Sequence, residues 1–138
     1  MPNVRSPGVY SIAYSERNIT NAEFAWCREI IYFGVADHIG KRLNQFDKTI
    51  SGKKNSHGGA DRARFKYQEY SKLIPRLYVA IAAIGKTPAQ NSPDCWRRKG
   101  DARQFEYHCI AEYLEKYGQL PTFNNQNSPK FSQQILDF

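Results

Sequence analysis

The sequence has no long apolar run. No stretch approaches the roughly 20 consecutive apolar residues that a membrane-spanning helix requires. Residues 1–5 lack the apolar segment of a secretory signal, so we expect a cytoplasmic, intracellular protein that does not enter a membrane. Cysteine is also scarce: Cys27, Cys95 and Cys109 are odd in number, widely spaced and without a Cys-x-x-Cys pair. This pattern argues against a disulfide framework and a zinc site, and favours reduced thiols.

What the chain does contain is typical of a single globular domain over residues 1–138, with 41% hydrophobic and 14% aromatic residues. Its formal net charge is +7, and the excess is concentrated. Between Lys41 and Arg76 there are ten Lys and Arg residues against three acidic ones. Such a concentration indicates a polyanionic partner, although a generic basic surface is the alternative. Composition leaves both a monomer and a homodimer open.

The first third of the chain predicts two strands followed by a helix. Residues 8–14 alternate in strand fashion, and residues 29–33 are rich in β-forming side chains. We expect a tight turn at Gly34, because glycine adopts backbone conformations that other residues avoid. A helix is then expected from about Asp37, a good N-cap residue, to Ile50.

The remainder predicts a helix over about residues 61–73, a strand over 77–84 and a last helix over about 101–117. The strand is almost continuously apolar and is therefore expected at the centre of the sheet. Asp101 is expected to cap the last helix and Gly118 to end it. The predicted fold class is α+β: a small three-stranded, mainly antiparallel sheet flanked by helices, in the order β-β-α-α-β-α.

One carboxylate of the last helix stands out. The apolar stripe of this helix includes Phe105, Cys109, Ile110 and Tyr113, and Glu106 falls inside it. A carboxylate on an inward face is costly unless it meets a cation, a metal ion or hydrogen-bond donors. Glu106 is therefore either a functional ligand or the partner of an internal salt bridge, for which Arg42 is the candidate.

Four positions taken together resemble a known family. Gly8-Val9-Tyr10 opens the first strand, Tyr32-Phe33-Gly34 ends the second, and Arg42 follows Tyr32 by ten residues. In order and setting these residues resemble the GIY-YIG nuclease family over roughly residues 7–124. Relative to simple members, the chain carries insertions at about 15–28 and 52–70.

The resemblance implies a divalent-metal-dependent DNA endonuclease with Tyr10, Tyr32, Arg42 and Glu106 as catalytic residues. It implies that Glu106 binds Mg²⁺ or Mn²⁺, and that Arg42 clamps a phosphate oxygen. Tyr10 is expected to be the general base with Tyr32 orienting the water or phosphate, although the two tyrosines could exchange roles. The context implied is a compact site-specific or nicking enzyme of a prokaryotic restriction system, a mobile element or a phage. The alternative is a non-catalytic nucleic-acid-binding regulator or inhibitor on the same scaffold.

Two departures from the family pattern leave room for other contributors. Val35 stands where many relatives carry Lys or a small polar residue, and Phe46 replaces a histidine. His57 or Lys41 could assist instead, although His57 could also be a plain loop residue. Asn124 is the nearest match to an assisting Asn that some members carry after the last helix.

Two basic clusters are candidate DNA contacts. The first surrounds a glycine-containing loop, whose small residues permit close approach of a phosphate backbone. Its members are Lys53, Lys54, Arg62 and Arg64. The second consists of Arg97 and Arg98 beside Trp96, in what we expect to be a loop, and a solvated surface is its alternative.

Overall fold

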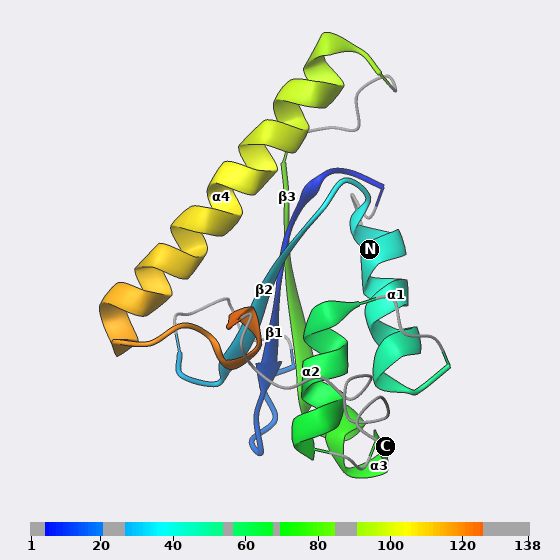
Figure 1. Ribbon diagram of the computed structural model, residues 1–138, viewed down its shortest axis with the longest axis vertical. Helices are drawn as coiled ribbons and strands as arrows, with labels where there is room; N and C mark the ends of the chain where they lie inside the picture. Colours follow the sequence, from blue (N-terminus) through cyan, green and yellow to red (C-terminus); the bar gives the residue numbers. More distant parts are fainter. Residues whose placement is uncertain (1–4, 21–26, 54–56, 68–69, 85–90, 126–138) are drawn as a thin grey trace, which may run out of the picture.

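The computed structural model describes residues 5–20, 27–53, 57–67, 70–84 and 91–125 (Figure 1). In chain order the elements are β1 (Gly8–Tyr14), β2 (Ile30–Ala36), α1 (Ile39–Ile50), α2 (Gly58–Tyr67), α3 (Tyr70–Leu73), the short 3-10 helix η1 (Ile74–Arg76), β3 (Leu77–Ala83), α4 (Pro93–Tyr117) and the 3-10 helix η2 (Thr122–Asn124). The α+β class with a small three-stranded sheet is confirmed. The second helical stretch is divided into α2 and α3.

The sheet is antiparallel throughout, in the order β2-β1-β3. The prediction that residues 77–84 form the central strand is wrong: β1 is central and β3 lies at the edge. On the face that α4 covers, the helix packs over β2 and β1 and leaves an apolar groove of about 460 Å³ beside Ala80 and Ala82 of β3. Val79, which points to the opposite face of β3, is half-exposed as well. The apolar run was therefore a sign of strand structure and not of full burial.

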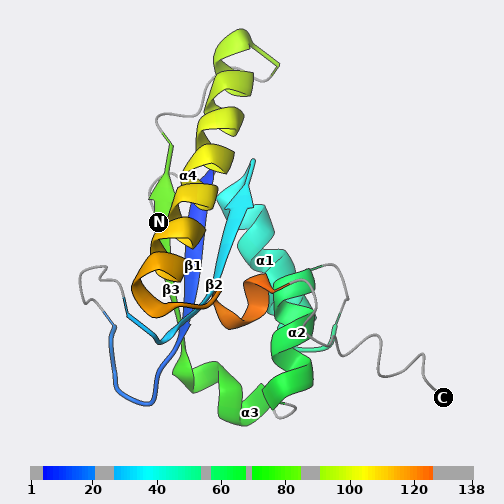
Figure 2. The same cartoon turned by 60° about the vertical axis from the view of Figure 1, so that its left-hand side comes forward.

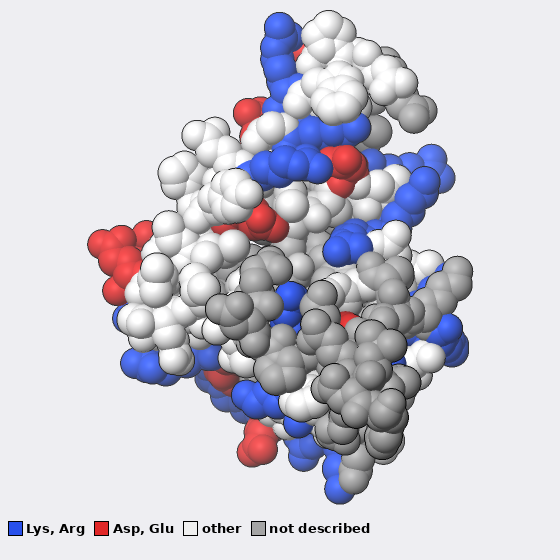
Figure 3. All heavy atoms as spheres, viewed as in Figure 1, with Lys and Arg blue, Asp and Glu red and all other residues white. Residues whose placement is uncertain are grey.

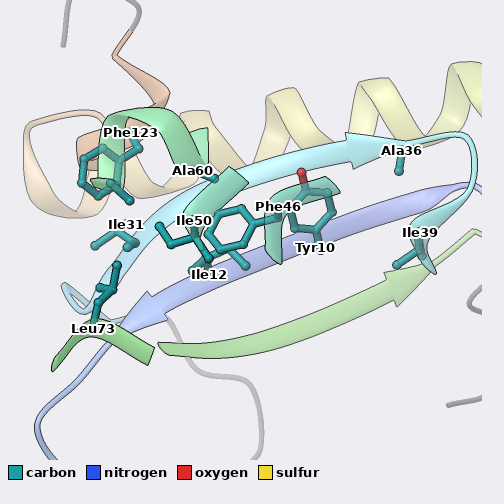
Figure 4. Packing of buried hydrophobic residues seen from close by; sticks show 11 residues of the cluster. Tyr10, Ile12, Ile31, Ala36, Ile39, Phe46, Ile50, Ala60, Leu73 and Phe123 are labelled. Atoms are coloured by element: carbon teal, nitrogen blue, oxygen red, sulfur yellow. The ribbon is translucent and has the colours of Figure 1, made fainter. Parts of the chain in front are cut away.

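Helices cover the two faces of the sheet (Figures 1 and 2). On one face α1 and α2 bury an apolar cluster that includes Tyr10, Ile12 and Phe46, and Figure 4 shows the Tyr10 hydroxyl pointing away from its strand. On the other face Cys109 and Tyr113 of α4 pack on Ile30 and Phe33 of β2. The sheet thus holds its functional candidates between two packed layers, which fixes their positions.

The turn expected at Gly34 does not exist. β2 runs through Gly34 to Ala36, and in the described residues the glycines with positive φ are Gly52 and Gly118. Gly34 is instead the cross-strand partner of Tyr10. The helix α1 then begins one residue later than expected, because the cap is His38, whose Nδ1 accepts a hydrogen bond of 3.1 Å from the Lys41 N–H. Asp37 is left outside the helix.

The last helix begins two turns earlier than predicted. Ser92 is its N-cap, and the Ser92 Oγ accepts a hydrogen bond of 3.1 Å from the Cys95 N–H. Pro93 occupies the first turn, where its missing N–H costs nothing. Residues 93–100 are therefore helical and not a loop. Gly118 ends α4 in the left-handed conformation at φ 73°, as predicted.

The buried face of α4 is narrower than the apolar stripe suggested. Ala102, Cys109 and Tyr113 are buried, whereas Phe105 is exposed. Glu106 lies between Ala102 and Cys109 along the helix and is partly buried. This agrees with the prediction that it lies on the inward side of α4. None of the described helices has the length and apolar character needed to cross a membrane. All three cysteines are free thiols, and Cys95 and Cys109 are buried.

The insertion at 15–28 is closed at its base by Glu29, the residue before β2. Arg17 Nη2 donates to Glu29 Oε1 at 2.5 Å, and the Ser15 hydroxyl donates to the other carboxylate oxygen. These bonds hold the two ends of the insertion together. They lie at the loop end of the β1–β2 hairpin, away from Gly34. Residues 21–26 of this insertion, Trp26 among them, and the loop residues 54–56 lie outside the described residues.

Candidate active site

Tyr10 and His57 form a buried hydrogen-bonded pair. Tyr10 Oη lies 2.6 Å from His57 Nε2, and each side chain is 1% exposed. His57 also begins α2: its Nδ1 accepts a hydrogen bond of 3.2 Å from the Ala60 N–H. Its own backbone N–H donates to Thr49 Oγ1 of α1 at 3.1 Å. His57 is therefore not a plain loop histidine, since three bonds tie it to β1, α1 and α2.

The hydrogen bond that His57 accepts from Ala60 determines which group is the donor in the hydrogen bond between His57 and Tyr10. Burial, and then the charge of Arg42, lower the pKa of His57 to about 3, so the ring is neutral at pH 7. Because Nδ1 accepts from Ala60, the single ring proton lies on Nε2. His57 therefore donates to Tyr10 Oη. This leaves the Tyr10 hydroxyl proton free to be donated to another group.

Two glycines make room for the two tyrosines. A Cβ added to Gly34 would lie 2.3 Å from Cζ and 2.4 Å from Oη of Tyr10. A Cβ added to Gly59 would lie 2.8 Å from Cε2 of Tyr32. Both rings thus lie against bare backbone, and their centroids are 6.1 Å apart. The glycine of the Tyr-Phe-Gly string is needed here for close approach and not for a turn.

Tyr32 and Tyr10 share a single electrostatic environment. Burial raises the pKa of Tyr32, while the charge of Arg42 and a hydrogen bond from Tyr10 lower it. Burial likewise raises the pKa of Tyr10, followed by the charge of Tyr32, and Arg42 opposes both. Tyr32 is partly exposed, whereas Tyr10 is not. The two tyrosines therefore differ in access: Tyr32 reaches the surface, whereas Tyr10 is enclosed and bonded to His57.

Arg42 connects the tyrosines to the protein surface. Its Nη1 donates to Gln45 Oε1 of the same helix at 2.7 Å, and its charge acts on Tyr10, Tyr32 and His57. It also lines a polar hollow of about 280 Å³ between the start of α1 and α4. The other charged or ionisable residues of that hollow are Asp37, His38, Lys41 and Arg103. Three of its lining residues, Lys41, Arg42 and Arg103, carry a positive charge against the single acid Asp37.

Glu106 approaches the same region from α4. Burial raises its pKa, which the charge of Arg103 and a hydrogen bond from the Val35 backbone oppose. The Glu106 charge in turn raises the pKa of Tyr32. Tyr10, Tyr32, Arg42 and Glu106 are thus brought within interaction range from β1, β2, α1 and α4. The charge of Glu106 also raises the pKa of Cys109, one helical turn further along α4.

Asn124 lies beside the site but is bonded to the backbone. Its Oδ1 accepts from the Phe33 N–H and its Nδ2 donates to the Phe33 carbonyl, each at 2.8 Å. The side chain of Asn124 therefore pairs with the open edge of β2 in the way a neighbouring strand would. Phe33 is flanked by Tyr32 and Gly34, so this contact supports the position of Tyr32.

The cations of the first predicted DNA-binding cluster differ in their exposure and surroundings. Lys53 is exposed, and Lys54 lies outside the described residues. Arg62 is only 6% exposed, so it is not a surface contact. Its charge acts inward and lowers the pKa of both Tyr32 and His57. The guanidinium of Arg64 lies against the backbone of Gly52, where an added Cβ would be 3.1 Å from Nη2.

The second basic cluster lies in the first turns of α4, and its side chains are exposed or partly exposed. Arg97 is exposed and pairs with Asp94 at 3.3 Å, while Arg98 is partly exposed. Sequence reasoning missed Arg103, which donates to Asp37 Oδ1 at 2.9 Å and lines the hollow with Arg42. The available signal was its spacing, one helical turn before Glu106 on the same side of α4.

Comparison of the chain with family models, with curated proteins and with solved structures found no match.

Proposed function

We propose that the protein is a metal-dependent endonuclease that hydrolyses DNA phosphodiester bonds. The observation that carries the proposal is the convergence of Tyr10, Tyr32, Arg42 and Glu106, which are up to 96 positions apart in sequence, on one polar region of an otherwise apolar interior. Phenols, a guanidinium and a carboxylate together supply proton transfer, phosphate binding and a cation ligand. The resemblance to the GIY-YIG nuclease family supports the same assignment.

The difference in exposure between the two tyrosines favours Tyr32 as the general base. A phenol accepts a proton from water only after losing its own, and a phenolate is stabilised by hydrogen bonds donated to it. The positive charge of Arg42 stabilises the phenolate of Tyr32 by lowering its pKa, and Tyr32 is partly exposed, whereas Tyr10 is 1% exposed and bonded to His57. Tyr10 is then a positioning residue that is hidden from substrate. This is the exchanged assignment that the sequence left open.

Arg42 supplies the positive charge that this step requires. A dianionic pentacovalent transition state forms when water attacks the phosphorus atom, and a guanidinium can bind two of its oxygens in a fixed geometry. Arg42 lines the solvent-facing hollow and also lowers the pKa of both tyrosines. One side chain therefore binds the phosphate and stabilises the phenolate beside it.

Glu106 fits the requirement of a Mg²⁺ or Mn²⁺ ligand. In the described residues no group of three His, Cys, Asp or Glu side chains lies together, so an ion there would have at most two such side chains as ligands. Mg²⁺ in nucleases is commonly held by one or two carboxylates, water and the substrate phosphate. When bound, such an ion would neutralise the phosphate and the leaving oxygen. Burial keeps Glu106 in place, and the Val35 backbone orients its carboxylate.

Incubation of supercoiled plasmid with the protein tests the proposal. Nicking or linearisation is expected with Mg²⁺ or Mn²⁺ and is expected to stop with chelator. Glu106→Gln is expected to abolish cutting, while Glu115→Gln on the exposed side of the same helix is the matched control and is expected to cut normally. Cutting that survives in Glu106→Gln would exclude Glu106 as the metal ligand.

A non-catalytic DNA-binding regulator is the second candidate. It is favoured by the burial of Tyr10 and by the raised pKa of both tyrosines, which keep the phenols protonated in the free protein. A protein that shifts DNA in a gel but cuts no duplex, single strand or branched substrate with either metal would be assigned to this class. In both cases the proposed setting is an intracellular one with DNA as partner.

A further inference from the structure

The N-terminal part of α4 extends beyond the sheet. The helix has 25 residues, which corresponds to a length of about 37 Å. In both views its first part, coloured lime, reaches past the ends of the three strands (Figures 1 and 2). The residues that pack on β2, Cys109 and Tyr113, lie in the second half. In the first half Cys95 and Ala102 are buried, whereas Trp96, Arg97 and Arg103 are exposed, so one side of this half faces away from the core.

The charge of α4 changes sign along its length. Residues 93–103 contain four cations (97, 98, 99 and 103) and two acids (94 and 101). Residues 104–117 contain three acids (106, 112 and 115) and one cation (116). In Figure 3 blue atoms gather over the projecting part and red atoms over the other end of α4. A polyanion is therefore attracted to the projecting half and repelled from the other.

The projecting half is fixed next to the candidate active site. Asp37, which follows β2, accepts a hydrogen bond from Arg103 Nη1 at 2.9 Å and lies 3.8 Å from Lys99 Nζ. Asp37 also borders the hollow that contains Arg42. A ligand lying along residues 93–103 would thus pass directly over the phosphate-binding end of the site.

This surface carries an exposed aromatic side chain among its cations. Trp96 is 62% exposed, and Lys99 Nζ lies 4.4 Å from its ring centroid. Arg97, the next residue, is exposed and forms a weak surface pair with Asp94. A tryptophan and an arginine side by side on an exposed helical surface are the side-chain types that contact bases.

We infer that residues 93–103 of α4 enter the major groove of the substrate duplex, where Trp96 and Arg97 read base edges beside the cut. The inference rests on the proposed function for the position of the cut. An α-helix about 10–12 Å wide fits a major groove about 12 Å wide. Arg97 has the two-pronged geometry that pairs with guanine, and Arg98 adds charge toward the phosphates.

Selection of bound duplexes from a randomised library, in chelator so that no cutting occurs, tests the inference. The unchanged protein is expected to enrich a preferred sequence over a few adjacent base pairs. Arg97→Lys keeps the charge but loses the two-pronged donor, so the preference at one of these positions is expected to fall about tenfold with the salt dependence of binding unchanged. Trp96→Ala is expected to relax a neighbouring position. Lys116→Ala, on the acidic half, is the matched control and is expected to retain the full preference.

The outcomes separate this inference from the proposed function. Unchanged preferences in Arg97→Lys and Trp96→Ala, or a uniform loss of affinity without loss of preference, would overturn the groove-reading role even if plasmid is cut. If the sequence preference depends on Arg97 but the protein never cuts DNA, the groove-reading role of α4 is supported and the nuclease function is overturned. Absence of duplex binding would overturn both. Circular dichroism of each variant shows whether it is folded.

Discussion

The ring of Tyr10 lies directly over the backbone of Gly34, its cross-strand partner. A Cβ at Gly34 would come within 2.4 Å of the Tyr10 hydroxyl oxygen, closer than packed atoms approach. Since the same hydroxyl is bonded to His57, any displacement of the ring also breaks a buried hydrogen bond. The candidate active site therefore depends on a missing side chain as much as on those present.

Gly34→Ala is expected to destabilise the protein by about 1–3 kcal/mol, because the added methyl overpacks a closed layer. It is also expected to abolish any cutting, because Tyr10 must move. Gly100→Ala is the matched control: nothing lies within 4 Å of its added Cβ, and the site is an exposed position inside α4. It is expected to stabilise by about 0.5–1 kcal/mol. Chemical denaturation measures both, and equal effects of the two variants would contradict the packing seen at Gly34.

Tyr32→Phe and Tyr10→Phe are expected to differ. Tyr32→Phe removes the proposed base and is expected to lower the cleavage rate by at least two orders of magnitude with little change in stability. Tyr10→Phe leaves the His57 Nε2–H without an acceptor in the core, which is expected to cost about 1–3 kcal/mol. Single-turnover cleavage and thermal melting are the measurements. Near-normal cutting by Tyr32→Phe would return the base role to Tyr10.

Glu106→Gln is expected to lose cleavage while DNA binding holds or improves, because a carboxylate near the phosphate is neutralised. The pKa of Glu106 is raised by burial, so the folded state holds its proton more tightly than the unfolded state does. Ionisation as the pH rises therefore costs stability, and the variant is expected to be equally or more stable at pH 7. Denaturation at pH 7 checks this. A loss of several kcal/mol would instead indicate a buried ion pair that had lost one member.

His57 is expected to make the protein acid-sensitive. Its pKa is near 6.5 when unfolded and about 3 when folded, because burial and Arg42 disfavour the charged ring. Between these values the unfolded state binds one more proton, so stability falls as the pH falls, by about 1.4 kcal/mol per pH unit. The stability of His57→Asn, which keeps an acceptor for the Ala60 N–H, is expected to lack this slope between pH 6.5 and 5. An identical slope in both proteins would show that other groups cause it.

Much of the fold could be predicted because its signals are local. Alternation in residues 8–14, the apolar run at 77–84 and Gly118 each reflect a preference that a short segment expresses by itself, and the α+β class follows from their order. The start of α4 was missed although its signal, Ser92 followed by Pro93, was also local. Asn91-Ser92-Pro93 and the basic residues that follow were interpreted as a loop, although a helix can carry the same charges.

The candidate site was likewise predictable from the sequence only in part. From the sequence by itself, Glu106 became a candidate through the apolar stripe of its helix, and Tyr10, Tyr32 and Arg42 became candidates through the resemblance to the GIY-YIG nuclease family. Only the tertiary structure decided that β1 is central, that Arg62 is buried, that His57 holds Tyr10 and that Arg103 joins Asp37. These contacts join segments 47 and 66 residues apart. Burial and pairing at such separations depend on how whole layers pack, and no local preference encodes them.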